Sequence, residues 1–89
     1  MNRKHYATLR AIFETPARAN VLWADALALM ETLGTQISEG AGSRVRFKLR
    51  GVRMVLHRPH PGKELDKGAV VTLREFLRNA GVEPDGKHL

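Results

Sequence analysis

The stretch RVRFKLRGVRMVLH, residues 44–57, alternates between apolar and mainly basic side chains on both sides of Gly51. Successive side chains of a β-strand point to opposite faces, so this alternation places the apolar residues on one face and the basic residues on the other. Gly51 interrupts the pattern between the two runs. The stretch therefore predicts a hairpin of two strands, 44–50 and 52–57, with one apolar face and one basic face.

Segments with helical spacing flank this hairpin. Apolar residues recur three and four positions apart in residues 3–14, 22–33 and 69–79, which predicts three amphipathic helices. Residues 35–39 predict a further short strand, and the prolines and glycines of residues 58–68 predict a loop. The expected order is α-α-β-β-β-α. This order predicts an α+β fold in which a three-stranded antiparallel sheet is covered on one face by the second and third helices.

Length and composition limit the domain organisation and the class of protein. A chain of 89 residues predicts one domain with a modest core, made of an N-terminal helix and linker (1–20), a core (21–82) and a flexible tail (83–89). The absence of cysteine excludes a disulfide framework and a thiolate metal site. No apolar run approaches the roughly 20 residues of a membrane span, so we expect a cytoplasmic protein that does not enter a membrane.

The charge balance favours a polyanionic partner. Fifteen Lys and Arg residues against nine Asp and Glu residues give a net charge of +6, and no acid occurs between Gly40 and Lys63. Neighbouring like charges repel, so a partner that neutralises them is expected; RNA is the first candidate and an acidic protein the second. A basic face that is merely solvated is the remaining alternative. The predicted nucleic-acid-binding residues are Arg44, Arg46, Lys48, Arg50, Arg53, Arg58 and Lys63.

Two histidines follow the basic strands. His57 ends the second strand of the hairpin on its basic face, and His60 lies between Pro59 and Pro61 in the predicted loop. Histidine can move protons near neutral pH, and arginine can stabilise charge that develops on a phosphate. This combination suits RNA cleavage without a metal or another cofactor. Two alternatives stay open: both imidazoles bond only to loop backbone, or they bind a metal together with Asp66, for which no further ligand is apparent.

The order of these segments resembles the HicA toxins of bacterial toxin–antitoxin pairs. The resemblance rests on LMETLGTQISEGAGSRVRF (29–47), the basic hairpin and HRPHPGKELDKGAVVTLREFLRNAGV (57–82), and it covers about residues 22–82. It implies an α-β-β-β-α core like that of double-stranded-RNA-binding domains. It also implies a small ribonuclease that cleaves mRNA to arrest translation and is neutralised by a HicB-type antitoxin.

One departure from the family pattern bears on catalysis. The resemblance implies a catalytic histidine directly after the Gly-Ser turn or one residue later, but Gly42-Ser43 is followed here by Arg44 and Val45. Arginine stays protonated and cannot carry the proton, although it can bind phosphate. Either His57 or His60 has taken over the proton transfer, or the chain binds RNA without cleavage, or it cleaves weakly by positioning alone.

We favour the first of these outcomes, with His60 ahead of His57. The two prolines restrict the backbone on both sides of His60. Arg58 and Lys63 flank it and supply groups that can bind phosphate.

Overall fold

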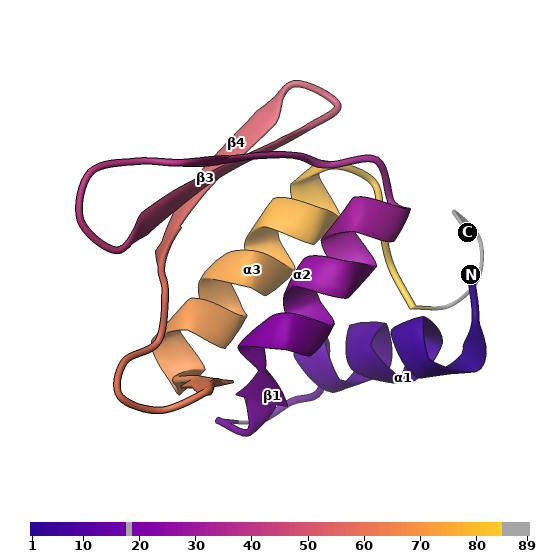
Figure 1. The fold of residues 1–89 in the computed structure, drawn as a ribbon. Helices are drawn as coiled ribbons and strands as arrows, with labels where there is room; N and C mark the ends of the chain where they lie inside the picture. The colour runs from indigo at the N-terminus through magenta and orange to yellow at the C-terminus, as the bar shows by residue number, and fades with distance from the viewer. Residues whose placement is uncertain (18, 85–89) are drawn as a thin grey trace.

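The computed structural model describes residues 1–17 and 19–84, and in this part of the chain three helices and two antiparallel sheets are present (Figure 1). The helices are α1 (Arg3–Ile12), α2 (Trp23–Thr32) and α3 (Lys67–Asn79). The strands are β1 (Val21–Leu22), β2 (Gln36–Glu39), β3 (Arg44–Leu49), β4 (Val52–His57) and β5 (Glu64–Leu65). The predicted α+β class is confirmed, and the predicted order gains two short strands.

The larger sheet has the order β2-β3-β4, and each neighbouring pair is antiparallel, as predicted. β3 and β4 are joined by a turn of two residues, Arg50 and Gly51, which have φ angles of 51° and 82°. Positive φ at both central positions matches the right-handed twist of the flanking strands. The first strand of the hairpin therefore ends at Leu49, one residue before the predicted end.

The smaller sheet corrects the prediction that residues 58–68 are entirely a loop. Within this segment β5 pairs with β1, with Val21 opposite Leu65, and the Trp23 backbone N–H donates to the Lys63 carbonyl at 2.9 Å. α3 also begins at Lys67 and not at Ala69, because the Asp66 side chain accepts a hydrogen bond from the Ala69 backbone N–H at 2.8 Å and caps the helix.

One apolar layer lies between the larger sheet and the helices. α2 and α3 lie side by side against one face of this sheet, as predicted, and α1 packs on the side of these helices away from it (Figure 1). Phe47 on β3 is 2% exposed, and its ring meets that of Trp23 on α2 edge to face at 6.1 Å. Leu73 and Leu77 on α3 are fully buried in the same cluster. The helices thus fix the position of the sheet and leave its other face exposed.

Residues that precede the expected core contribute to it. Leu9 and Ile12 of α1 are 0% exposed and belong to the same buried cluster as Phe47. The Tyr6 hydroxyl donates to the Pro84 carbonyl, which ties the start of α1 to the segment after α3. Of the predicted flexible tail, residues 85–89 lie outside the described residues, whereas Pro84 is half-buried.

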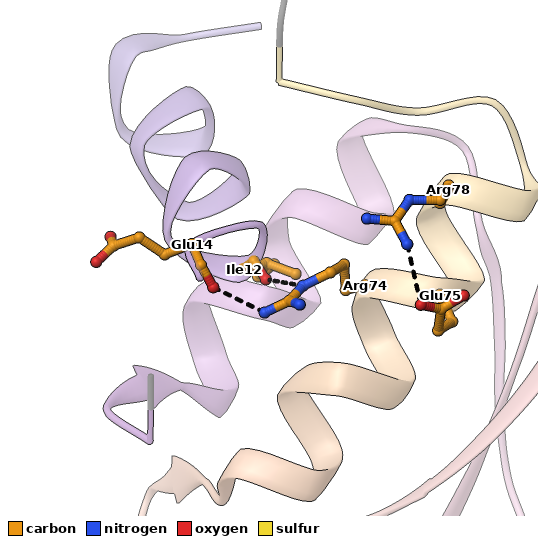
Figure 2. Close-up of polar contacts among 5 residues, drawn as sticks. All are labelled: Ile12, Glu14, Arg74, Glu75 and Arg78. Carbon is orange, nitrogen blue, oxygen red and sulfur yellow. Dashed lines mark hydrogen bonds and ion pairs between the residues drawn. The ribbon is translucent and has the colours of Figure 1, made fainter. Parts of the chain in front are cut away.

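A buried arginine fastens α3 to the end of α1. Arg74 is 8% exposed, and its guanidinium donates to the Ile12 carbonyl at 3.0 Å and to the Glu14 carbonyl at 2.8 Å (Figure 2). Ile12 is the last residue of α1 and Glu14 lies two residues beyond it, and the carbonyls at a helix C-terminus lack the backbone N–H donor that the next turn would provide. Arg78, one turn later on α3, forms an exposed ion pair with Glu75 at 3.0 Å (Figure 2). The two arginines thus have different surroundings on the same helix.

Candidate nucleic-acid interface

The exposed face of the larger sheet carries most of the predicted RNA-binding residues, and we call it the basic face. Paired residues of an antiparallel sheet point to the same side, so the register places the outward side chains of β2, β3 and β4 together. These side chains are all exposed. They belong to Gln36, Ser38, Arg44, Arg46, Lys48, Arg53, Val55 and His57.

The register also shows which of these side chains are closest. The Arg58 backbone N–H donates to the Ser43 carbonyl at 2.8 Å, which continues the β3–β4 ladder beyond Arg44 and His57. Since hydrogen-bonded and non-hydrogen-bonded pairs alternate along such a ladder, Arg44–His57 and Lys48–Arg53 are non-hydrogen-bonded pairs. Side chains approach most closely in pairs of this kind, at about 4.5–5.5 Å between Cβ atoms. The basic face therefore has an imidazole next to Arg44 at one end and two cations next to each other at the other.

The cations of the basic face have no carboxylate partner in the described part of the chain. Among residues 1–17 and 19–84, ion pairs are formed by Lys4, Arg58 and Arg78, and by none of the cations of the basic face. Like charges directly opposite each other destabilise a sheet, so we expect the Lys48–Arg53 pair to lower the stability of the free protein. An anion bound between them would remove this repulsion.

Four residues lie near the end of the basic face where β3 begins, and we call this place the Ser43 end. The Ser43 hydroxyl lies 3.3 Å from Nδ1 of His57, and Arg44 pairs with His57 across the strands. The Arg46 side chain extends toward this end on the side of β2, because a Cβ at Gly40 would lie 3.4 Å from Cζ of its guanidinium. The Ser43 end thus combines Ser43, Arg44, Arg46 and His57, which supply one group that can exchange a proton and two guanidiniums that can bind phosphate.

Two other predicted RNA-binding arginines are engaged elsewhere. Arg50 lies in the hairpin turn, and its guanidinium donates to the Ala80 carbonyl at 2.9 Å, at the C-terminal end of α3. Its charge there faces the negative end of the helix dipole. Arg58 forms an ion pair with Glu39 at 3.3 Å. Glu39 pairs with the buried Val45, so its side chain belongs to the face opposite the basic face. The contribution of both arginines to RNA binding stays a prediction.

His60 and Lys63 lie in the segment between β4 and β5. Both side chains are exposed, and within the described part of the chain His60 has no hydrogen-bond partner, in contrast to His57. His57, His60 and Asp66 do not meet: no group of three or more potential metal ligands occurs among residues 1–17 and 19–84. Asp66 instead caps α3.

Periodicity and composition do not point to Ser43 and Gly40 as parts of the site. No catalytic motif includes Ser43 in this sequence. The pairing of its neighbour Arg44 with His57, however, could have been predicted. If Arg50 and Gly51 form a two-residue turn, counting back along both strands places His57 opposite Arg44. The contact between Ser43 and His57 depends on the conformation of the Gly40–Ser43 turn, which has no such periodic signal.

The described helices offer no membrane span, since none of them is long and apolar enough to cross a bilayer. Searches of curated proteins and of solved structures give no significant match. The model of one family, described as HicA toxin of bacterial toxin–antitoxin, matches residues 23–82 of the 89-residue chain. This match runs from the first residue of α2 past the end of α3 and includes the whole basic face. Its extent shows that the chain belongs to the HicA toxin family.

Proposed function

We propose that this protein is a ribonuclease toxin that binds mRNA on the basic face and cleaves it at the Ser43 end. Family membership supports a toxin of a toxin–antitoxin pair. The observation that carries the proposal further is the cross-strand pair of Arg44 and His57. It puts an imidazole beside the position after Gly42-Ser43, where the family resemblance implies a histidine.

The chemistry needs one group that exchanges protons and one that stabilises negative charge. His57 would take the proton from a ribose 2′-hydroxyl, whose oxygen then attacks the neighbouring phosphorus while the bond to the 5′-oxygen breaks. The leaving 5′-oxygen would take up a proton from the imidazolium or from water. Arg44 and Arg46 would stabilise the charge on the phosphate oxygens. No step in this scheme requires a metal ion or another cofactor.

The geometry favours His57 over His60 as the proton carrier. His57 lies on the basic face, pairs with Arg44 and contacts Ser43. His60 is exposed and has no hydrogen-bond partner among the described residues, so no hydrogen bond in that part of the chain orients its ring. Since catalysis requires a group held near the reacting atoms, we place His57 first and retain His60 as the second candidate.

The order of helices and strands supports a fold type and a mode of RNA binding. The order α2-β2-β3-β4-α3 is that expected for a double-stranded-RNA-binding domain, and we propose that the chain folds as one HicA-like domain of this kind. The basic face would bind the RNA backbone largely through phosphate contacts. A HicB-type antitoxin would neutralise the toxin in the cytoplasm, where mRNA is translated.

One observation favours a second function, RNA binding without cleavage. Arg44 stands where the family resemblance implies a histidine, and arginine cannot exchange a proton near neutral pH. In that case the basic face would still hold RNA, but His57 would contribute no proton transfer.

Incubation of the purified protein with labelled RNA, with and without a chelator, tests the proposal. We expect fragments in both reactions, and much less fragmentation with His57→Ala at equal protein concentration. Bound but intact RNA under all conditions would support the binding function. RNA that is neither bound nor cleaved would contradict both.

A further inference from the structure

Ser43 and His57 form the only hydrogen bond that a side chain makes to an imidazole in the described part of the chain. Ser43 Oγ lies 3.3 Å from Nδ1 of His57. Within residues 1–17 and 19–84 the Nε2 atom of the same ring has no partner. The two ring nitrogens therefore differ: the serine occupies one, and the other is available to a ligand.

The backbone on both sides of this contact is held by hydrogen bonds. The Ser43 carbonyl accepts from the Arg58 backbone N–H at 2.8 Å, directly after His57. On the other side, the Gly40 backbone N–H donates to the Arg44 carbonyl at 2.8 Å and closes the turn that contains Ser43. Ser43 and His57 thus lie on neighbouring, bonded segments, and the backbone that carries the hydroxyl has a fixed place beside the ring.

We infer that Ser43 is a positioning residue that fixes the His57 ring: Nδ1–H donates to Ser43 Oγ, and Nε2 is left unprotonated on the basic face. A neutral imidazole carries its proton on one nitrogen only, so a hydrogen bond from Nδ1–H selects the tautomer in which Nε2 is the base. The inference rests on the proposed function for its catalytic meaning, since Nε2 would be the atom that takes the proton from the 2′-hydroxyl. Ser43 itself forms no bond to the substrate.

The tautomer can be measured without any cleavage assay. Nitrogen-15 NMR of the neutral imidazoles distinguishes protonated from unprotonated nitrogens, and His60 is the internal reference because its exposed ring has no partner among the described residues. We expect a larger Nδ1–H fraction at His57 than at His60 in the parent protein. Ser43→Ala should bring His57 to the ratio of His60, and Ser43→Thr, which keeps a hydroxyl, should preserve the parent ratio.

Ser38→Ala is the matched control. Ser38 is also exposed on the basic face but pairs with Arg46 and lies on β2, which β3 separates from His57 on β4. This variant should leave the His57 tautomer unchanged. An equal tautomer ratio at His57 in the parent and in Ser43→Ala would overturn the inference.

The cleavage assay separates this inference from the proposed function. We expect Ser43→Ala to lower the cleavage rate about 10-fold with unchanged RNA affinity, and Ser43→Thr to retain the rate. For comparison, loss of the hydrogen-bond partner that orients a metal-bound imidazole typically costs about 10- to 100-fold. A parent protein that cleaves no RNA would refute the proposed function, but the NMR comparison would still decide whether Ser43 holds the ring. A full cleavage rate in Ser43→Ala would overturn the positioning role.

Discussion

Arg44 and His57 face each other across β3 and β4 as a non-hydrogen-bonded pair on the exposed face of the sheet. This relationship joins a group that can exchange a proton to one that is always charged, at a separation set by the sheet and not by a flexible loop. In a chain without the histidine implied directly after Gly42-Ser43, it supplies an imidazole from the neighbouring strand. Under the proposed function, this register would supply the imidazole that the family resemblance implies at the neighbouring position.

The first prediction compares the two histidines. His57→Ala should lower the cleavage rate by about 10²–10⁴-fold, the usual contribution of a general acid or base, and leave RNA affinity within a few-fold. His60→Ala should have the smaller effect, because its ring has no described partner that would orient it. Rates from single-turnover assays and affinities for a cleavage-resistant RNA measure the two quantities separately. A larger loss in His60→Ala would return the catalytic assignment to the loop.

The second prediction concerns the like-charge pair of Lys48 and Arg53. Replacing both by alanine should weaken RNA binding and make the slope of log affinity against log salt less steep by about 1.4, since each phosphate contact on a single strand contributes about 0.7. Arg53→Glu should stabilise the free protein by about 0.2–1 kcal/mol, because it replaces repulsion across the strands by attraction. Salt titrations and thermal melts measure these effects. Tighter RNA binding by Arg53→Glu would show that RNA lies elsewhere.

The third prediction tests the buried side of the same sheet. Phe47 is 2% exposed and packs edge to face on Trp23, so Phe47→Ala should destabilise the protein by about 3–5 kcal/mol. Many domains have a total stability of only about 5–15 kcal/mol, so this variant is expected to be partly or wholly unfolded at 37 °C. Denaturant melts followed by Trp23 fluorescence measure the change. Lys48→Ala, at the next position of β3, is the exposed control and should shift the stability by no more than about 0.5 kcal/mol.

The fourth prediction concerns the attachment of α1 to the family core. Arg74→Met keeps much of the apolar stem but leaves the carbonyls of Ile12 and Glu14 without their donor, which should cost about 1–3 kcal/mol. Arg78→Met on the same helix removes only an exposed ion pair with Glu75 and a contact with the Phe13 ring, and it should cost about 1 kcal/mol or less. Denaturant melts of the two variants provide a matched comparison. Equal losses of stability would show that α1 is only loosely attached.

The sequence was sufficient to predict the main sheet and its two faces, because period-two alternation in residues 44–57 is a local signal. It did not predict the pairing of β1 with β5, since strands of two residues are too short to show a period and their partner is distant in the chain. The burial of Arg74 could not be predicted from the sequence either. An arginine on an amphipathic helix is usually exposed. The carbonyls that accept hydrogen bonds from Arg74 belong to residues 60 and 62 positions away in the chain, so local sequence carries no sign of them.

Part of the candidate site could likewise be predicted from the sequence, and part could not. Alternation was enough to place the cations of β3 and His57 on one face, and the structure shows them there. It was not enough for Arg50, because the strand ends one residue earlier and the turn directs the guanidinium to α3. The contact of Ser43 with His57 depends on side-chain positions at a turn, for which spacing along the chain carries no information.

The last prediction concerns a variant that restores the histidine implied by the family resemblance. Arg44→His should raise the cleavage rate, since the cross-strand pair would then hold two imidazoles, one as base and the other as acid. Arg44→Lys is the control: it keeps a cation but adds no group that exchanges protons near neutral pH, so its rate should not exceed that of the parent.

The decisive comparison combines Arg44→His with His57→Ala. If the Gly40–Ser43 turn directs position 44 at the phosphate, the double variant should cleave faster than His57→Ala alone, and Arg44→His by itself should cleave fastest. Single-turnover rates with the same RNA, at protein concentrations well above the measured Kd, compare the variants without interference from changes in affinity. A double variant no faster than His57→Ala, together with an Arg44→His rate at or below that of the parent, would show that the turn in this chain no longer presents position 44 to the scissile bond. Catalysis would then depend on His57 alone.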